Sequence, residues 1–272
     1  MKLTRPGRAA AALIAAAALI AAGCGDDDAD TSASQSDDQL SSAGATPADS
    51  EFCDAAVAVD AASIGLESGD ATPDDFEQAL QAAEESAPAS IADAIGVMTA
   101  EARRLMAEAE ASQSEEGPPP IPSDDFFAAS VDVGGYLSDN CGFETLDVTA
   151  TNYQFDGLPE TAPAGTTVLN FTNDGTEFHE IYLGQLPEGE DRSLDDLLSL
   201  PEDQQPETTD KAFVLAPPGA QTYVTAELDP GRYVAICFVP VGATPEALES
   251  GAPLDEEDSH FMHGMLAELT VE

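Results

Sequence analysis

The pattern of apolar and polar positions divides the chain into a helical part and a strand-rich part. Over residues 51–143, apolar residues recur at three- and four-residue steps, as in one long stripe that includes Ile91 and Leu105. Thr72 and Ser123 each place a capping hydroxyl ahead of acidic residues, which favour the first turn of a helix. The pattern predicts an up-and-down bundle of about four short helices.

From residue 144 onward, short alternating segments bounded by turn residues predict strands. About seven strands are expected, and they cover residues 146–155, 166–171, 178–183, 212–215, 222–228, 232–239 and 265–271. Two acidic stretches interrupt this pattern as surface excursions, residues 187–210, with a short helix expected over 193–200, and residues 242–259. The predicted fold class is therefore α+β, a small helical bundle over 51–143 followed by an antiparallel β-sandwich over 144–272.

Residues 1–23 have the pattern of an export signal. Basic residues precede an apolar run that is too short to span a bilayer comfortably, and small residues end the run just before Cys24. This resembles a bacterial lipoprotein signal, which implies that Cys24 is lipidated and anchors the exported protein to the outer face of the cell membrane. An ordinary secretory signal is the alternative. Residues 24–50 have little to bury and are expected to form a disordered acidic tether.

The charge of the chain excludes several classes of partner. The sequence has 53 Asp and Glu residues against 8 Lys and Arg residues, a formal net charge of −45. Nucleic acids and anionic membrane surfaces are bound through Lys and Arg, so neither is expected as a partner, and membrane contact is expected only through the lipid. The acidity is explained either by a salt-adapted, halophilic host or by an acidic docking surface.

The four cysteines have different expected fates. With Cys24 lipidated, three remain in an oxidising compartment, where two should pair. Cys53 and Cys141 bracket the helical segment and are the predicted disulfide. Cys237 is then the odd thiol, and an unpaired thiol outside the cell is a liability unless something such as a metal ion uses it.

Near the end of the chain are the side chains needed to hold one copper ion. A trigonal set of two His and one Cys with a weak axial Met is the ligand set of electron-transfer copper sites. The candidate ligands are His179, Cys237, His260 and Met265, with His263 and Met262 as alternatives because they lie beside the last two.

Three stretches within residues 145–272 resemble the cupredoxin family, closest in pattern to plastocyanin-like domains. Residues 168–181 resemble the strand, Asn-containing loop and first His ligand, residues 230–237 the strand that delivers the thiolate, and residues 260–265 the His-to-Met loop. The resemblance implies a Greek-key sandwich with one type 1 copper ion and a hydrogen bond to the thiolate from the backbone around Asn173. The departure is the long insertion over residues 238–259, where the family has only a few residues.

The leading hypothesis is a lipid-anchored, extracytoplasmic carrier of single electrons between redox proteins, monomeric, with an exposed ligand edge beside His260. The alternatives are a copper-handling lipoprotein without redox turnover and a metal-free interaction module. An enzyme is not expected. Multicopper oxidases carry a His-Cys-His run, whereas Ile236 and Phe238 flank Cys237, and the chain has only 3 His residues.

The excess of acidic residues predicts that folding depends on salt. Screening weakens the repulsion between like charges, so the melting temperature should rise from low salt to molar NaCl. Thermal unfolding followed by circular dichroism at increasing NaCl concentration measures this effect. A melting temperature that stays flat or falls would contradict the prediction and would indicate that bound cations already neutralise the charge.

Overall fold

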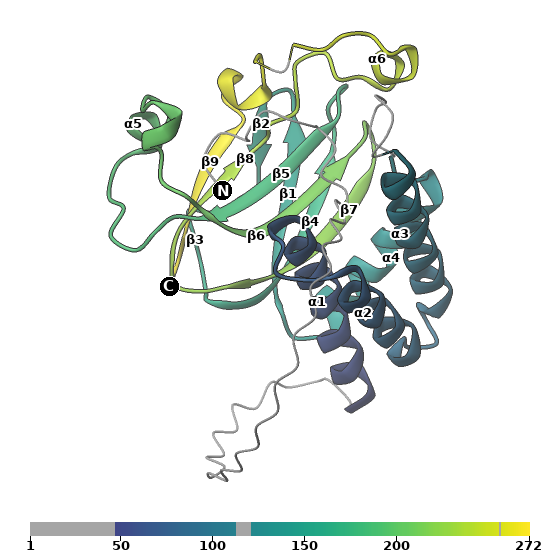
Figure 1. Ribbon diagram of the computed structural model, residues 1–272. Helices are drawn as coiled ribbons and strands as arrows, with labels where there is room; N and C mark the ends of the chain where they lie inside the picture. The colour runs from purple at the N-terminus through teal and green to yellow at the C-terminus, as the bar shows by residue number, and fades with distance from the viewer. Residues whose placement is uncertain (1–46, 113–120, 256) are drawn as a thin grey trace, which may run out of the picture.

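The computed structural model describes residues 47–112, 121–255 and 257–272 of the chain. In this part, four helices come first and nine strands in two sheets follow (Figure 1). The order confirms an α+β chain in which a helical part precedes a β domain. The predicted signal over residues 1–23, the lipidation site Cys24 and most of the tether over 24–50 lie outside the described residues.

The helices begin where the sequence places helix-starting residues. They are α1 Pro47–Ser68, α2 Pro73–Ser86, α3 Ala92–Ser112 and α4 Asp124–Asn140. Thr72 and Asp75 cap α2 reciprocally, since each side chain accepts a hydrogen bond from the backbone N–H of the other. Ser123 caps α4 by accepting a hydrogen bond from the N–H of Phe126. Both predicted starts are confirmed, while α1 begins inside the last residues of the predicted tether. None of the described helices has the length and apolar composition to cross a bilayer.

The strands form two sheets around a shared core. In chain order they are β1 Glu144–Thr151, β2 Gln154–Asp156, β3 Thr161–Ala162, β4 Gly165–Asn173, β5 His179–Gln185, β6 Thr209–Ala216, β7 Gln221–Leu228, β8 Gly231–Ile236 and β9 Leu266–Val271. The sheets have the orders β2-β1-β4-β7 and β3-β9-β8-β5-β6. Side chains from both sheets, among them Val148, Phe171, Ile181 and Ala235, form one buried cluster.

The prediction of a purely antiparallel sandwich is wrong. β1 pairs with β4 in parallel, and β3 pairs with β9 in parallel. After β2 the chain crosses to the other sheet at β3, and when it returns as β4 it runs in the same direction as β1. The other pairings are antiparallel.

Two stretches differ from the predicted elements. The strand expected over residues 146–155 is a hairpin of β1 and β2, because the chain turns at Tyr153, whose φ is 61°. In the excursions, the structure has α5 Leu194–Leu198, η1 Glu202–Gln204 and α6 Pro245–Ser250. The first of these lies within the short helix predicted over residues 193–200, and the structure has Ser193 as its N-terminal cap. α6 was not predicted from the sequence, although Thr244 caps it ahead of Pro245 as Thr72 caps α2.

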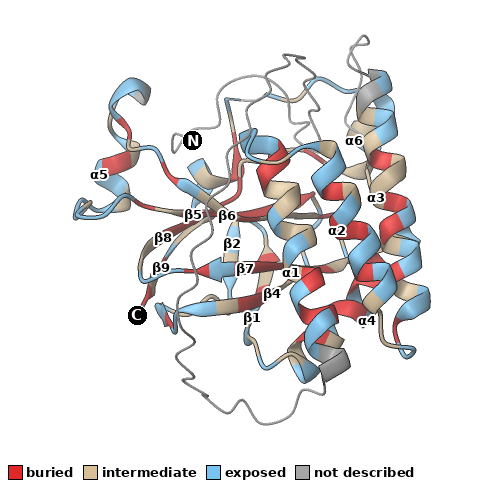
Figure 2. Cartoon of the chain, turned by 60° about the horizontal axis from the view of Figure 1, so that its bottom comes forward, coloured by how far each residue is buried: buried red, intermediate tan, exposed pale blue. Residues whose placement is uncertain are grey.

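The helices form a layer over one sheet (Figures 1 and 2). α1 and α4 lie against β7, and α4 also contacts β4, while α2 packs against α1 and α3. One apolar cluster joins Phe52 and Val133 to Val168 of β4. Asp60 Oδ2 of α1 accepts hydrogen bonds from the N–H and the hydroxyl of Thr225 in β7, at 2.8 and 2.6 Å. Since β7 is the edge of its sheet, α1 covers backbone groups that would otherwise be exposed.

A disulfide ties the first helix to the end of the last. Cys53 in α1 and Cys141, which follows α4, are bonded with Cα atoms 5.7 Å apart. This is the pairing expected from the sequence, and Cys237 is the free, buried cysteine of the described part. The bond therefore closes the helical layer just before the chain enters β1.

Replacing Cys53 and Cys141 together by Ala should lower the free energy of unfolding by about 4 kcal/mol, because the bond restrains the unfolded chain. The two residues are separated by 88 positions, a long loop. Urea unfolding of the wild type and the double variant measures the loss. As a control, dithiothreitol should lower the wild-type midpoint and leave the variant unchanged. Equal midpoints without reductant would contradict the prediction.

Candidate metal centre

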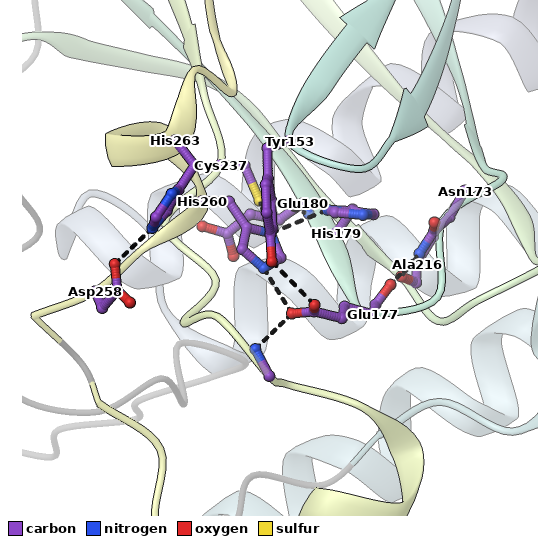
Figure 3. A network of polar contacts seen from close by, with 11 residues as sticks. Tyr153, Asn173, Glu177, His179, Glu180, Ala216, Cys237, Asp258, His260 and His263 are labelled. Atoms are coloured by element: carbon purple, nitrogen blue, oxygen red, sulfur yellow. Dashed lines mark hydrogen bonds and ion pairs between the residues drawn. The ribbon is translucent and has the colours of Figure 1, made fainter.

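Three of the predicted ligands come together at one end of the β domain. One donor atom from each of His179, Cys237 and His260 lies within 4.8 Å of the other two, and all three residues are buried. His260 Nδ1 is 3.0 Å from His179 Nδ1 and 3.4 Å from Cys237 Sγ (Figure 3). Their positions are distant in sequence, so the fold assembles the cluster.

The pairing of β5, β8 and β9 places these donors. His179 is the first residue of β5, and Cys237 directly follows β8. β8 lies between β5 and β9, and Ile236 is opposite Tyr182 on one side and Leu266 on the other. The loop that carries His260 is bonded to the backbone of Cys237, because the Phe261 N–H donates to the Cys237 carbonyl at 3.0 Å.

The thiol is fully buried and is contacted by backbone donors. The Glu180 N–H lies 3.4 Å from Cys237 Sγ. Burial raises the pKa of the Cys237 thiol well above its ordinary value, with a further increase from the Glu180 carboxylate, and the N–H groups of Glu180 and Val239 oppose this only in part. A metal ion that binds here must therefore displace the thiol proton, which a coordinating cation does.

The resemblance implied a hydrogen bond to the Cys237 sulfur from the backbone around Asn173, whereas Asn173 stabilises the loop that precedes His179. Its side-chain N–H₂ donates to the carbonyls of Glu177 and Ala216, both at 2.8 Å, and its Oδ1 accepts from the Gly175 N–H. These bonds hold the loop that precedes His179. The hydrogen bond to the sulfur comes instead from the residue that follows His179.

Both imidazoles are neutral at neutral pH. Burial lowers the pKa of His179 to about 4, with a further decrease from His260, and Glu177 opposes the shift. Burial also lowers the pKa of His260, against the effect of its hydrogen bond to Glu177. Among the described residues, His179 Nε2 has no hydrogen-bond partner. Neutral imidazole nitrogens have lone pairs that can bind a metal ion.

The structure separates His260 and Met265 from their alternatives. Met265 is fully buried in the same cluster as Cys237, and its carbonyl accepts a hydrogen bond from the Cys237 N–H at 3.2 Å. In contrast, Met262 is 61% exposed. His263 points to the surface, where its Nε2 lies 2.6 Å from Asp258 Oδ1.

The insertion leaves His260 beside Cys237 because its ends meet. Pro240 and Ser259 form an antiparallel bridge, and Val241 N–H donates to the Asp258 carbonyl at 2.8 Å. The segment between them, which includes α6, projects as a closed excursion. The extra residues therefore do not separate His260 from Cys237. A long loop is tolerated here because the entropic cost of closing a loop grows only slowly with its length.

The expectation of an exposed ligand edge beside His260 is wrong, because His260 is 0% exposed. Tyr153 covers its ring at a centroid distance of 4.7 Å, and Glu177 Oε2 lies 3.1 Å from its Nε2 (Figure 3). Neither residue was singled out from the sequence. The one feature of the sequence that could have indicated Tyr153 is its position, as a bulky residue between two short alternating segments. No feature of the pattern indicated Glu177.

The donor types and their convergence fit one type 1 copper ion. Two imidazoles and a thiolate are the trigonal set of such sites, and the buried Met265 belongs to the same core. Thiolate and thioether suit Cu(I), while imidazole suits both oxidation states.

Protein-family models and curated proteins give no match to this chain. Among solved structures, it is similar to auracyanin from Roseiflexus castenholzii, with 24% identity over 47% of this chain and 96% of that one and a TM-score of 0.30. Auracyanin A, a "blue" copper protein from Chloroflexus aurantiacus, has 24% identity over 47% of this chain and 98% of its own, with a TM-score of 0.29. Rusticyanin from Thiobacillus ferrooxidans has 17% identity over 47% of this chain and 78% of its own, with a TM-score of 0.27.

A multi-copper oxidase from Pediococcus acidilactici also matches, with 12% identity over 48% of this chain and 26% of that one and a TM-score of 0.26. At these identities and scores, no residue role is carried over from any of these proteins. Auracyanin and rusticyanin are blue copper proteins of the cupredoxin family, and this chain has its own His-Cys-His cluster.

Proposed function

We propose that this chain is a lipid-anchored, extracytoplasmic type 1 copper protein that transfers single electrons between redox partners. One observation carries the proposal: two imidazoles and an otherwise unpaired thiol, all buried, converge within 4.8 Å. Burying three such groups together is costly unless they are bonded to something. When bound, copper supplies a one-electron couple.

The protein's own part in this function is to hold the ligands still. Cys237 is fixed by strand pairing, His179 begins a strand, and His260 is held from both sides of its ring. A ligand set that does not rearrange suits a site that gains and loses an electron. The same burial disfavours copper delivery, because releasing the ion would require the loop over residues 259–265 to open.

Partner contact is proposed at the surface next to His260. Tyr153 lies on its ring, and His263 lies on Tyr153 at a centroid distance of 5.2 Å. Met262, beside them, is one of the exposed large apolar residues of the described part. An electron carrier needs a short path to the surface and no substrate pocket, and these side chains provide the path. Enzymatic activity is not proposed.

The copper site predicts a specific pattern of variants. Adding Cu(II) should give the wild type an intense visible band from thiolate-to-copper charge transfer, and Cys237→Ser should abolish it. His260→Ala should bleach or shift the band, whereas His263→Ala, the matched control, should keep it. Met265→Leu should keep the colour and raise the reduction potential, because a weak donor that favours Cu(II) is lost, while Met262→Leu should change neither.

Visible spectra and voltammetry of these variants test the assignment. Bleaching by His263→Ala but not by His260→Ala would contradict the choice of ligand. A wild type that binds no copper in either oxidation state would favour the metal-free interaction module.

The lipid anchor predicts the location of the protein. Cys24→Ser should remove the site of lipidation and move the protein from the membrane to the soluble fraction. Immunoblots of fractionated cells measure this, with Cys237→Ser as a control that should stay in the membrane. Membrane retention of Cys24→Ser would contradict the anchor.

A further inference from the structure

Glu177 joins three loops that surround the metal centre (Figure 3). Its Oε2 lies 3.1 Å from His260 Nε2 and accepts a hydrogen bond from the Gly242 N–H at 2.5 Å. Its Oε1 accepts a hydrogen bond from the Tyr153 hydroxyl at 3.1 Å. Its own carbonyl is bound by Asn173. Glu177 is therefore held through both its backbone carbonyl and its carboxylate, and the carboxylate connects the β1–β2 turn, the insertion and the loop of His260.

These contacts determine the tautomer of His260. Both oxygens of the Glu177 carboxylate already act as acceptors, Oε2 toward the Gly242 N–H and Oε1 toward the Tyr153 hydroxyl. The oxygen that faces His260 Nε2 is therefore an acceptor, so His260 Nε2 must carry the proton of this hydrogen bond. In the neutral ring Nδ1 is then a lone pair, and this is the atom that lies beside Cys237 Sγ and His179 Nδ1.

We propose that Glu177 is a positioning residue of the metal centre, which holds His260 with Nδ1 free for the metal and makes this imidazole a stronger donor. A carboxylate bound to the second nitrogen of a ligand His fixes the ring and raises its basicity. A stronger, negatively supported donor favours Cu(II) over Cu(I), so Glu177 lowers the reduction potential. The inference rests on the proposed copper function and assigns a role to a residue outside the ligand set.

The first test separates charge from shape. Glu177→Gln keeps the size and an acceptor oxygen but removes the charge. Asp258→Asn is the matched control, because it removes a charge from the carboxylate bound to His263, which is not in the cluster. Loss of such a partner commonly weakens metal binding 10- to 100-fold. We expect Cu(II) affinity to fall about tenfold relative to Cu(I), which raises the potential by about 59 mV.

Voltammetry of the copper-loaded proteins gives the result. The inference predicts that Glu177→Gln keeps the visible band and raises the potential clearly more than Asp258→Asn does. A shift no larger than that of the control would overturn the role of the charge. A wild type with no visible band would contradict the proposed copper function. The role of Glu177 is tested separately, in the metal-free protein.

The second test uses the metal-free protein. Long-range ¹H–¹⁵N NMR correlations distinguish protonated from unprotonated ring nitrogens. The inference predicts a single tautomer of His260 with the proton on Nε2 in the wild type and in Glu177→Gln, and a mixture in Glu177→Ala. If His260 keeps the proton on Nε2 in Glu177→Ala, or carries it on Nδ1 in the wild type, the positioning role is refuted. The ¹H–¹⁵N backbone spectrum confirms that each variant is folded.

Discussion

The register of β8 between β5 and β9 is the constraint on which the metal centre depends. Pairing on both sides fixes Cys237 against the start of β5 and against Met265, which directly precedes β9. A slip of one residue would turn every side chain to the opposite face and would move the thiol out of the core. Both faces of β8 are buried, so a slip would also place Tyr233 and Val234 in spaces shaped for other side chains, which lowers stability. The chemistry of the site is therefore a consequence of sheet packing.

The loops at this end of the β domain complete what the sheet begins. Asn173 and Glu177 bind the loop before His179 to its neighbours, and the closed insertion brings His260 back to Cys237. The result is an interior in which the two imidazoles are neutral and the thiol holds its proton strongly. Such groups are poorly satisfied by one another. A cation that replaces the thiol proton would satisfy all three, which is the physical reason to connect this cluster with a metal.

The features that the sequence could predict are local ones. Helix starts at Thr72 and Ser123 and the donor types of His179, Cys237 and His260 are read from residues and their neighbours. The features that it could not predict depend on distant pairs. Parallel pairing of β1 with β4 follows from the path of the chain between the sheets, and the contact of Glu177 with His260 joins positions 83 residues apart. The burial of His260 has the same origin, since its cover comes from other loops.

The most direct test of the central claim is the crystal structure of the copper-loaded protein, with anomalous diffraction measured on both sides of the copper absorption edge. The account predicts one copper peak within bonding distance of Cys237 Sγ, His179 Nδ1 and His260 Nδ1, with the Met265 sulfur facing it. A peak at His263 or among surface carboxylates, with none at Cys237, would contradict the account.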